Sequence, residues 1–116
     1  VKVEQKIAKE NMEVGRINYF IFTISNAGYS EANSVKLEIN VNENFEYYLP
    51  RQCQKISEIK IECNLDNIKP DEISKIKITI KSLKEGEYQF SAVINYFDVQ
   101  NIEYYIETEN ITISVI

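Results

Sequence analysis

The chain has 116 residues, enough for one hydrophobic core and too few for two full domains, so we expect a single domain over residues 1–116. Apolar residues make up 44% and charged residues 27% of the sequence, which excludes collagen-like and disordered classes. There is no histidine, which removes Ser-His-Asp and Cys-His catalysis and imidazole metal ligands. A net charge of −5 with dispersed lysines argues against nucleic acid as a partner.

Membrane insertion and chain context can also be judged from the sequence. No apolar run approaches the roughly 20 residues that cross a bilayer, so we expect no direct membrane insertion within this segment. The first residue is Val1, and we therefore expect a domain excised from a longer multi-domain protein.

Alternation of apolar and polar residues, which is typical of half-buried strands, begins near the N-terminus. A weak strand over 1–7 precedes Ile17–Ser25, which is apolar on both sides for part of its length and is predicted to be a central strand. Residues 35–41 alternate regularly, whereas 42–52 form the longest irregular stretch. A strand, a turn centred near Ser57 and Glu58, and a second strand then predict a hairpin.

The second half of the chain continues the same pattern. Residues 75–81 and 88–96 alternate strictly, and both are predicted strands. Apolar residues occupy even positions over 102–106 and odd positions over 111–115. A regular strand cannot change faces, so 107–110 must contain a bulge, kink or turn.

Turn residues separate these strands, and no segment of ten residues keeps a helical period between caps. We therefore predict an all-β fold, an immunoglobulin-like antiparallel β-sandwich of seven to eight strands. The predicted turns lie at residues 26–28, 69–72, 84–86 and 98–101.

The two cysteines lie on the two strands of the predicted hairpin. An antiparallel pairing places Cys53 opposite Cys63, where a disulfide can form, and two thiols without histidine cannot complete a zinc site. Closing so short a loop would contribute about 3 kcal/mol and would imply an oxidising compartment. The alternative is two buried free thiols in a cytosolic domain.

Four segments, 15–19, 24–32, 63–72 and 86–94, show a family pattern, with Cys53 at the position of the partner thiol. Together they resemble the immunoglobulin-like repeat domains of bacterial and archaeal surface and S-layer-like proteins, a group that includes the cell-adhesion-related bacterial domains. The resemblance implies a noncatalytic module of a long extracellular protein that acts as a spacer, adhesion or assembly domain. In segment 24–32, Asn26 and Gly28 tolerate the left-handed backbone of a tight turn.

Exposed aromatic rings offer an alternative function, because they can stack on the apolar faces of sugars. The candidates are Tyr47 and Tyr48 in the irregular stretch and Tyr105 near the C-terminus. Adjacent residues of a strand face opposite ways, so only one of Tyr47 and Tyr48, and only one of Tyr104 and Tyr105, can reach a ligand. Packing of these rings in the core and its rim is the competing interpretation.

Charged side chains suggest no catalytic or metal site. The acidic turn over 66–72 has too few oxygens for calcium, so no metal or cofactor is expected. Lys75, Lys77 and Lys81 could dock an anionic polymer or protect an exposed strand edge. The glutamates fall on polar faces, where water leaves them unsuited to acid-base catalysis, so we expect no enzyme.

The sequence thus predicts a noncatalytic structural or adhesion module of a prokaryotic secreted or cell-surface protein. Its expected partners are other domains of the same protein or cell-envelope proteins. The alternatives are a carbohydrate-binding module that uses the tyrosines to bind a polysaccharide, and an intracellular β-sandwich with free thiols.

Overall fold

A computed structural model describes residues 1–116 and confirms the all-β prediction. It has eleven strands: β1 (Lys2–Ile7), β2 (Asn11–Met12), β3 (Ile17–Ser25), β4 (Ala32–Asn40), β5 (Phe45–Tyr48), β6 (Cys53–Ser57), β7 (Lys60–Ile68), β8 (Ile73–Ser82), β9 (Gly86–Phe97), β10 (Glu103–Glu107) and β11 (Ile111–Val115). The count exceeds the predicted seven to eight, and two of the additional strands, β2 and β5, are too short to show alternation. No helix is present that could cross a bilayer.

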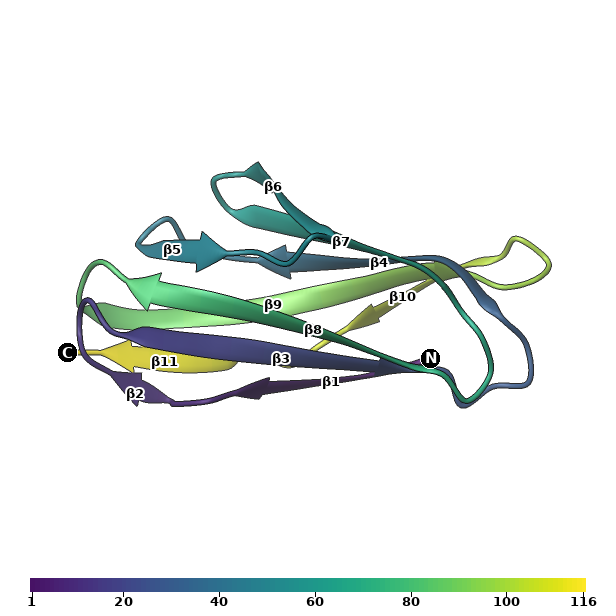
Figure 1. Cartoon of the computed structure of the whole chain (residues 1–116), viewed down its shortest axis with the longest axis horizontal. Coiled ribbons are helices and arrows are strands. Elements are labelled where there is room, and N and C mark those ends of the chain that lie inside the picture. Colours follow the sequence, from purple (N-terminus) through teal and green to yellow (C-terminus); the bar gives the residue numbers. More distant parts are fainter.

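The strands form two sheets that pack face to face (Figure 1). One sheet has the order β1-β3-β8-β5, and the other β2-β11-β9-β4-β7-β6, with β10 also paired to β9. All neighbours are antiparallel except β2 and β11, which are parallel. This arrangement confirms the immunoglobulin-like sandwich.

Near the C-terminus, the apolar side chains were predicted to change face within residues 107–110, and the structure has a bulge opposite β9 at this point. Strand β10 pairs Glu107 with Val93, and β11 resumes by pairing Ile111 with Phe90. Three residues on one side therefore lie opposite two on the other, which turns the following side chains to the other face. The amide and hydroxyl of Thr108 bond to the backbone of Ala92 at 2.9 and 2.8 Å, so hydrogen bonding continues through the bulge.

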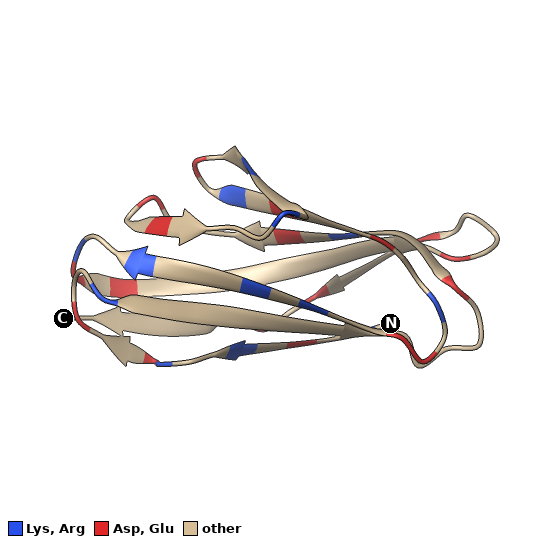
Figure 2. Cartoon of the chain, in the orientation of Figure 1, with Lys and Arg blue, Asp and Glu red and all other residues tan.

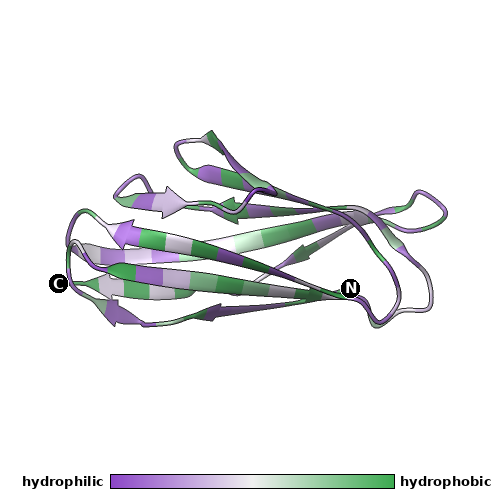
Figure 3. Cartoon of the chain, viewed as in Figure 1, coloured by the Kyte–Doolittle hydropathy of each residue, from purple (hydrophilic) through white to green (hydrophobic).

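The core consists of the inward positions of both sheets, and hydropathy accordingly alternates along the long strands (Figure 3). Phe90 lies at its centre, with ring centroids 4.8 Å from Phe20 and 5.3 Å from Phe45. Isoleucines dominate the rest, as expected for strand interiors. The largest fully buried aliphatic side chains are Ile24, Leu37, Ile39, Ile61, Ile76, Ile78, Ile80, Ile94 and Ile113.

Asn26 and Gly28, which both tolerate a left-handed backbone, do not take it in the structure. The buried side chain of Asn26 instead donates to the carbonyls of Ser30 and Ile68 at 2.8 and 2.9 Å and accepts from the Gly28 amide at 3.0 Å. Asn26 therefore links two turns at one end of the sandwich.

The molecule is elongated, with principal extents of 47 × 23 × 21 Å. Its radius of gyration is 14.7 Å, above the value of about 13.4 Å expected for a compact domain of this length. The N- and C-termini lie toward opposite ends of the long axis (Figure 1).

Candidate interaction surfaces

The predicted disulfide is present. Cys53 on β6 lies opposite Cys63 on β7, and the S–S distance is 1.97 Å. No free cysteine remains. The turn between the strands lies at Glu58 and Ile59, one residue beyond its predicted centre. The bridge attaches the outermost strand of the larger sheet to its neighbour.

The prediction that Tyr47 and Tyr48 lie in an irregular stretch is wrong, because Phe45–Tyr48 forms strand β5. The Tyr47 ring points inward, and its hydroxyl donates to the Asn42 carbonyl at 2.6 Å and accepts from the Asn42 amide at 2.8 Å. Burial raises the pKa of Tyr47 far above its usual value. Tyr48 points outward and is 51% exposed. A hydrogen bond from its hydroxyl to Glu46 raises the pKa of Tyr48.

Tyr105 lies on the outer surface of the other sheet, where it is 65% exposed and pairs with Asn95 of β9. Its hydrogen bond with Glu103 raises the pKa of Tyr105. The structure therefore brings none of the three candidate tyrosines together, since Tyr47 is internal and Tyr48 and Tyr105 lie on opposite faces. Ligand binding by them stays a prediction.

In the acidic turn over 66–72, which was considered as a calcium site, polar groups form hydrogen bonds within the protein. Glu72 accepts the Lys69 amide at 2.8 Å, and the Asp71 amide donates to the Asn26 carbonyl at 2.8 Å. No cluster of three acidic or cysteine side chains suited to a metal ion occurs in the structure.

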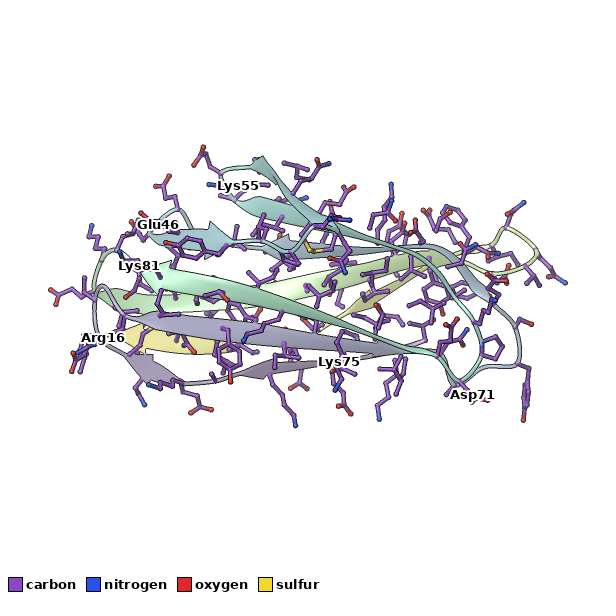
Figure 4. All side chains as sticks on the ribbon, in the orientation of Figure 1. Arg16, Glu46, Lys55, Asp71, Lys75 and Lys81 are labelled. Atoms are coloured by element: carbon purple, nitrogen blue, oxygen red, sulfur yellow. A yellow bond between two sulfur atoms is a disulfide. The ribbon has the colours of Figure 1, made fainter.

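The outer face of the β1-β3-β8-β5 sheet is rich in lysine, and we call it the lysine face. Strand register sets its rows: Lys6, Ile21 and Lys77 form one row, and Tyr19, Thr79 and Tyr48 form the next. Lys77 Nζ lies 4.4 Å from the centroid of the Tyr19 ring. Figure 2 shows charged residues along β1, β8 and β5, and Figure 4 labels Glu46, Lys75 and Lys81 among them. The charged residues of this face are Lys2, Lys6, Lys75, Lys77, Lys81, Glu4 and Glu46.

The prediction that these lysines protect a strand edge fits part of β8. This strand pairs with β3 along nearly its whole length, but with β5 only from Thr79 onward. Lys75 and Lys77 therefore flank an unpaired edge, where lysine discourages pairing with another strand. Lys81 lies inside the sheet, opposite Glu46.

The outer face of the other sheet has the reverse charge, and we call it the glutamate face. Alternation along β4, β7, β9 and β10 turns outward Glu38, Glu62, Glu87, Glu103, Glu107, Lys36 and Lys60. A polar hollow of about 500 Å³ opens on this face beside Phe97, Asn64 and Asp66. Asp66 has a left-handed backbone, with a φ of 57°.

These two packed sheets define an immunoglobulin-like β-sandwich module. A model of the CARDB family matches residues 1–112, and the chain belongs to that family. The predicted resemblance to surface-protein domains is thereby confirmed. No curated protein sequence matches the chain.

Several solved structures share the fold. A CARDB domain from Pyrococcus furiosus, in complex with di-metal ions, has 14% identity and a TM-score of 0.64, over 98% of this chain and 92% of that one. A cohesin module from a family 33 glycoside hydrolase of Clostridium perfringens has 12% identity and a TM-score of 0.65, over 97% and 96%.

The major pilin subunit BcpA of Bacillus cereus has 10% identity and a TM-score of 0.72. The match covers 98% of this chain and 40% of the pilin, so the chain corresponds to less than half of that subunit. At these identities the likeness concerns the fold.

Proposed function

We propose that this chain is a noncatalytic spacer and protein-interaction module of a secreted or cell-surface protein. The observation that carries the proposal is its elongated shape, 47 Å long with the termini toward opposite ends. A module of this form lengthens a multi-domain protein along its long axis, because the chain leaves at one end and enters well toward the other (Figure 1). Membership of the CARDB family supports the same role.

The Cys53–Cys63 disulfide supports an extracellular location for the module. Disulfides persist in oxidising compartments and are rare in the cytosol, where thiol reductants remove them. Neighbouring domains of the same protein, or other proteins of the cell envelope, are the partners that such a location provides.

Labelling of intact cells tests this proposal. The full protein is exposed in its native host to a membrane-impermeant amine reagent, and thiols are trapped with a maleimide polymer before any reductant is added. We expect labelling of exposed lysines without lysis and no trapped thiol at Cys53 or Cys63. Labelling that requires lysis, together with two trapped thiols, would overturn the proposed location. A cytosolic protein of the same cells serves as the lysis control.

A further inference from the structure

The two outer faces of the sandwich carry opposite charge. The lysine face has five lysines and two glutamates, and the glutamate face has five glutamates, Asp66 and two lysines. The faces belong to different sheets, so their charges are separated by the thickness of the core. The molecule therefore has a basic side and an acidic side despite its net charge of −5.

Most of these charges have no ion-pair partner within the chain. Lys2 pairs with Glu4 at 3.6 Å on the lysine face, and Lys60 pairs with Glu38 at 3.9 Å on the glutamate face. The other charged side chains of the two faces form no ion pair within 4.0 Å. They are Lys6, Lys75, Lys77, Lys81, Glu46, Lys36, Glu62, Asp66, Glu87, Glu103 and Glu107.

Large apolar side chains lie among the unpaired lysines. Ile17 is 52% exposed and Ile73 is 63% exposed, and Tyr19 and Tyr48 lie in the row between Ile17 and Ile21. On the glutamate face, the comparable apolar groups are Tyr105, Val93 and Phe97. Apolar and aromatic residues bordered by charge are typical of protein interfaces.

We propose that the lysine face docks on the glutamate face of a second copy of this chain. Contact between the lysine face of one copy and the glutamate face of the next pairs their unpaired charges and covers the exposed isoleucines and tyrosines. A hydrated polyanion would match only the lysines and would leave Ile17 and Ile73 in water. The two patches differ, so the contact is heterologous and leaves a free face at each end of a growing stack.

The expected contact is weak. The four strands of the lysine face have four to ten residues, and at about 3.3 Å per residue and about 4.8 Å between strands they cover roughly 500 Å². The total of about 1,000 Å² lies at the low end for specific complexes. Association would therefore depend on high local concentration, such as that of neighbouring molecules on a surface. The inference rests on the proposed module role, but self-association can fail in solution while surface labelling succeeds, so the two proposals fail separately.

Sedimentation of the purified chain at low and high salt tests the contact. We expect the weight-average mass to rise at least about 1.5-fold between about 10 μM and about 1 mM protein at low ionic strength. The rise should vanish near 1 M salt, where the Debye length falls to about 3 Å. In NMR spectra recorded over the same concentration range, chemical-shift changes should appear on both faces together. A constant mass at low salt, with or without binding to the polyanion heparin, would overturn the proposal, and so would shifts confined to one face.

Charge reversal provides the decisive comparison. Lys75→Glu with Lys77→Glu should abolish association, and so should Glu103→Lys with Glu107→Lys. An equimolar mixture of the two double variants should associate again, because each reversed face then meets its complement. Lys69→Glu with Lys84→Glu has the same net charge as the first variant but lies off both faces, and it should retain most of the association. A monomeric mixture of two folded variants would overturn the proposal.

Discussion

Asn26 joins the turn after β3 to the turn before β8, through two donated side-chain hydrogen bonds and one accepted. Asn26→Asp keeps an acceptor for Gly28 but places a carboxylate against the carbonyls of Ser30 and Ile68. We expect the free energy of unfolding to fall by about 2–3 kcal/mol, because a buried charge replaces two donors. Urea denaturation measures this loss.

Asn64 is the matched control for this substitution. It is exposed, and its side-chain oxygen accepts the Asp66 amide at 3.0 Å, a role that an aspartate can also fill. Asn64→Asp should therefore change stability by no more than about 0.5 kcal/mol. Equal effects of the two substitutions would show that the buried donors of Asn26 have no special role.

The disulfide gives a second prediction at the residue scale. Cys53 and Cys63 are ten positions apart, and closing a loop of this length should stabilise the fold by about 3 kcal/mol through the entropy of the unfolded chain. We expect urea unfolding of the wild-type chain to show this difference with and without reductant. Cys53→Ala with Cys63→Ala should unfold at the same urea concentration in both conditions. An unchanged wild-type midpoint on reduction would contradict the prediction.

Asp98 organises the turn between β9 and β10 and gives a prediction about pH. Its carboxylate accepts the amides of Ile102 and Gln100 at 3.0 and 2.8 Å and the Tyr104 hydroxyl at 3.1 Å. The hydrogen bond from Ile102, followed by the other two, lowers the pKa of Asp98 below its usual value. The carboxylate therefore stabilises the turn above its unfolded-state pKa, and this contribution is lost as pH falls through the folded pKa.

Proton titration followed by NMR checks this expectation. The Asp98 carboxyl should titrate with a midpoint below about 3.9, the value for an unperturbed aspartate. The Ile102 and Gln100 amide signals should move with the same midpoint. In Asp98→Asn, whose amide oxygen still accepts, those amides should lose this transition. A midpoint at or above the unperturbed value would contradict the assigned hydrogen bonds.

Residue roles were predictable only where they follow from position in a strand. Alternation correctly indicates that Tyr47 and Tyr48 face opposite ways, and the hairpin register correctly pairs Cys53 with Cys63. The role of Asn26 was not predictable, because its partners include Ile68, which lies 42 positions away. The sequence around Asn26 predicts a turn, but it does not show whether the backbone conformation or the side-chain amide of Asn26 stabilises that turn.

At the scale of elements, the parallel pair β2 and β11 joins the two ends of the chain within the larger sheet. The Ser114 amide donates to the Glu10 carbonyl at 2.9 Å, and the Ile116 amide donates to the Met12 carbonyl at 2.9 Å. Ser114→Pro removes the first donor. We expect it to lower the free energy of unfolding by about 1–3 kcal/mol, because the Glu10 carbonyl loses its partner.

Thr112→Pro is the control for this loss. Thr112 lies two positions before Ser114 on the same strand, so its amide points the same way but beyond the two residues of β2. Its replacement should cost clearly less, as measured by thermal unfolding followed by circular dichroism. A larger cost for Thr112→Pro would indicate that β2 contributes little to the sheet.

Element prediction depended on length. Strands β3, β8 and β9 have nine to twelve residues and alternate over most of that length, so periodicity indicates them directly. Strands β2 and β5 have two and four residues and are defined by their partners β11 and β8. The order of strands in each sheet was not predictable, because it depends on contacts between segments that are distant in sequence.

At the scale of the whole molecule, the segregation of charge onto two faces was not predictable from the sequence. Lysines and glutamates are interspersed along the chain, and the sequence alone grouped only Lys75, Lys77 and Lys81 on one side of one strand. Period-two alternation assigns each residue to one side of its strand, and strand order then brings Lys6 of β1 beside the rows of β3 and β8. Segregation of charge onto two faces therefore appears only when pairing is known.

The elongated shape makes a prediction about tandem copies. Two copies joined by a linker of about three residues should lie end to end, because the termini lie toward opposite ends of the long axis. Small-angle X-ray scattering in high salt, where docking between faces is screened, should show the maximum dimension increasing by close to 47 Å. An increase no larger than the 23 Å width would show that the copies fold back side by side, and the spacer role would then fail.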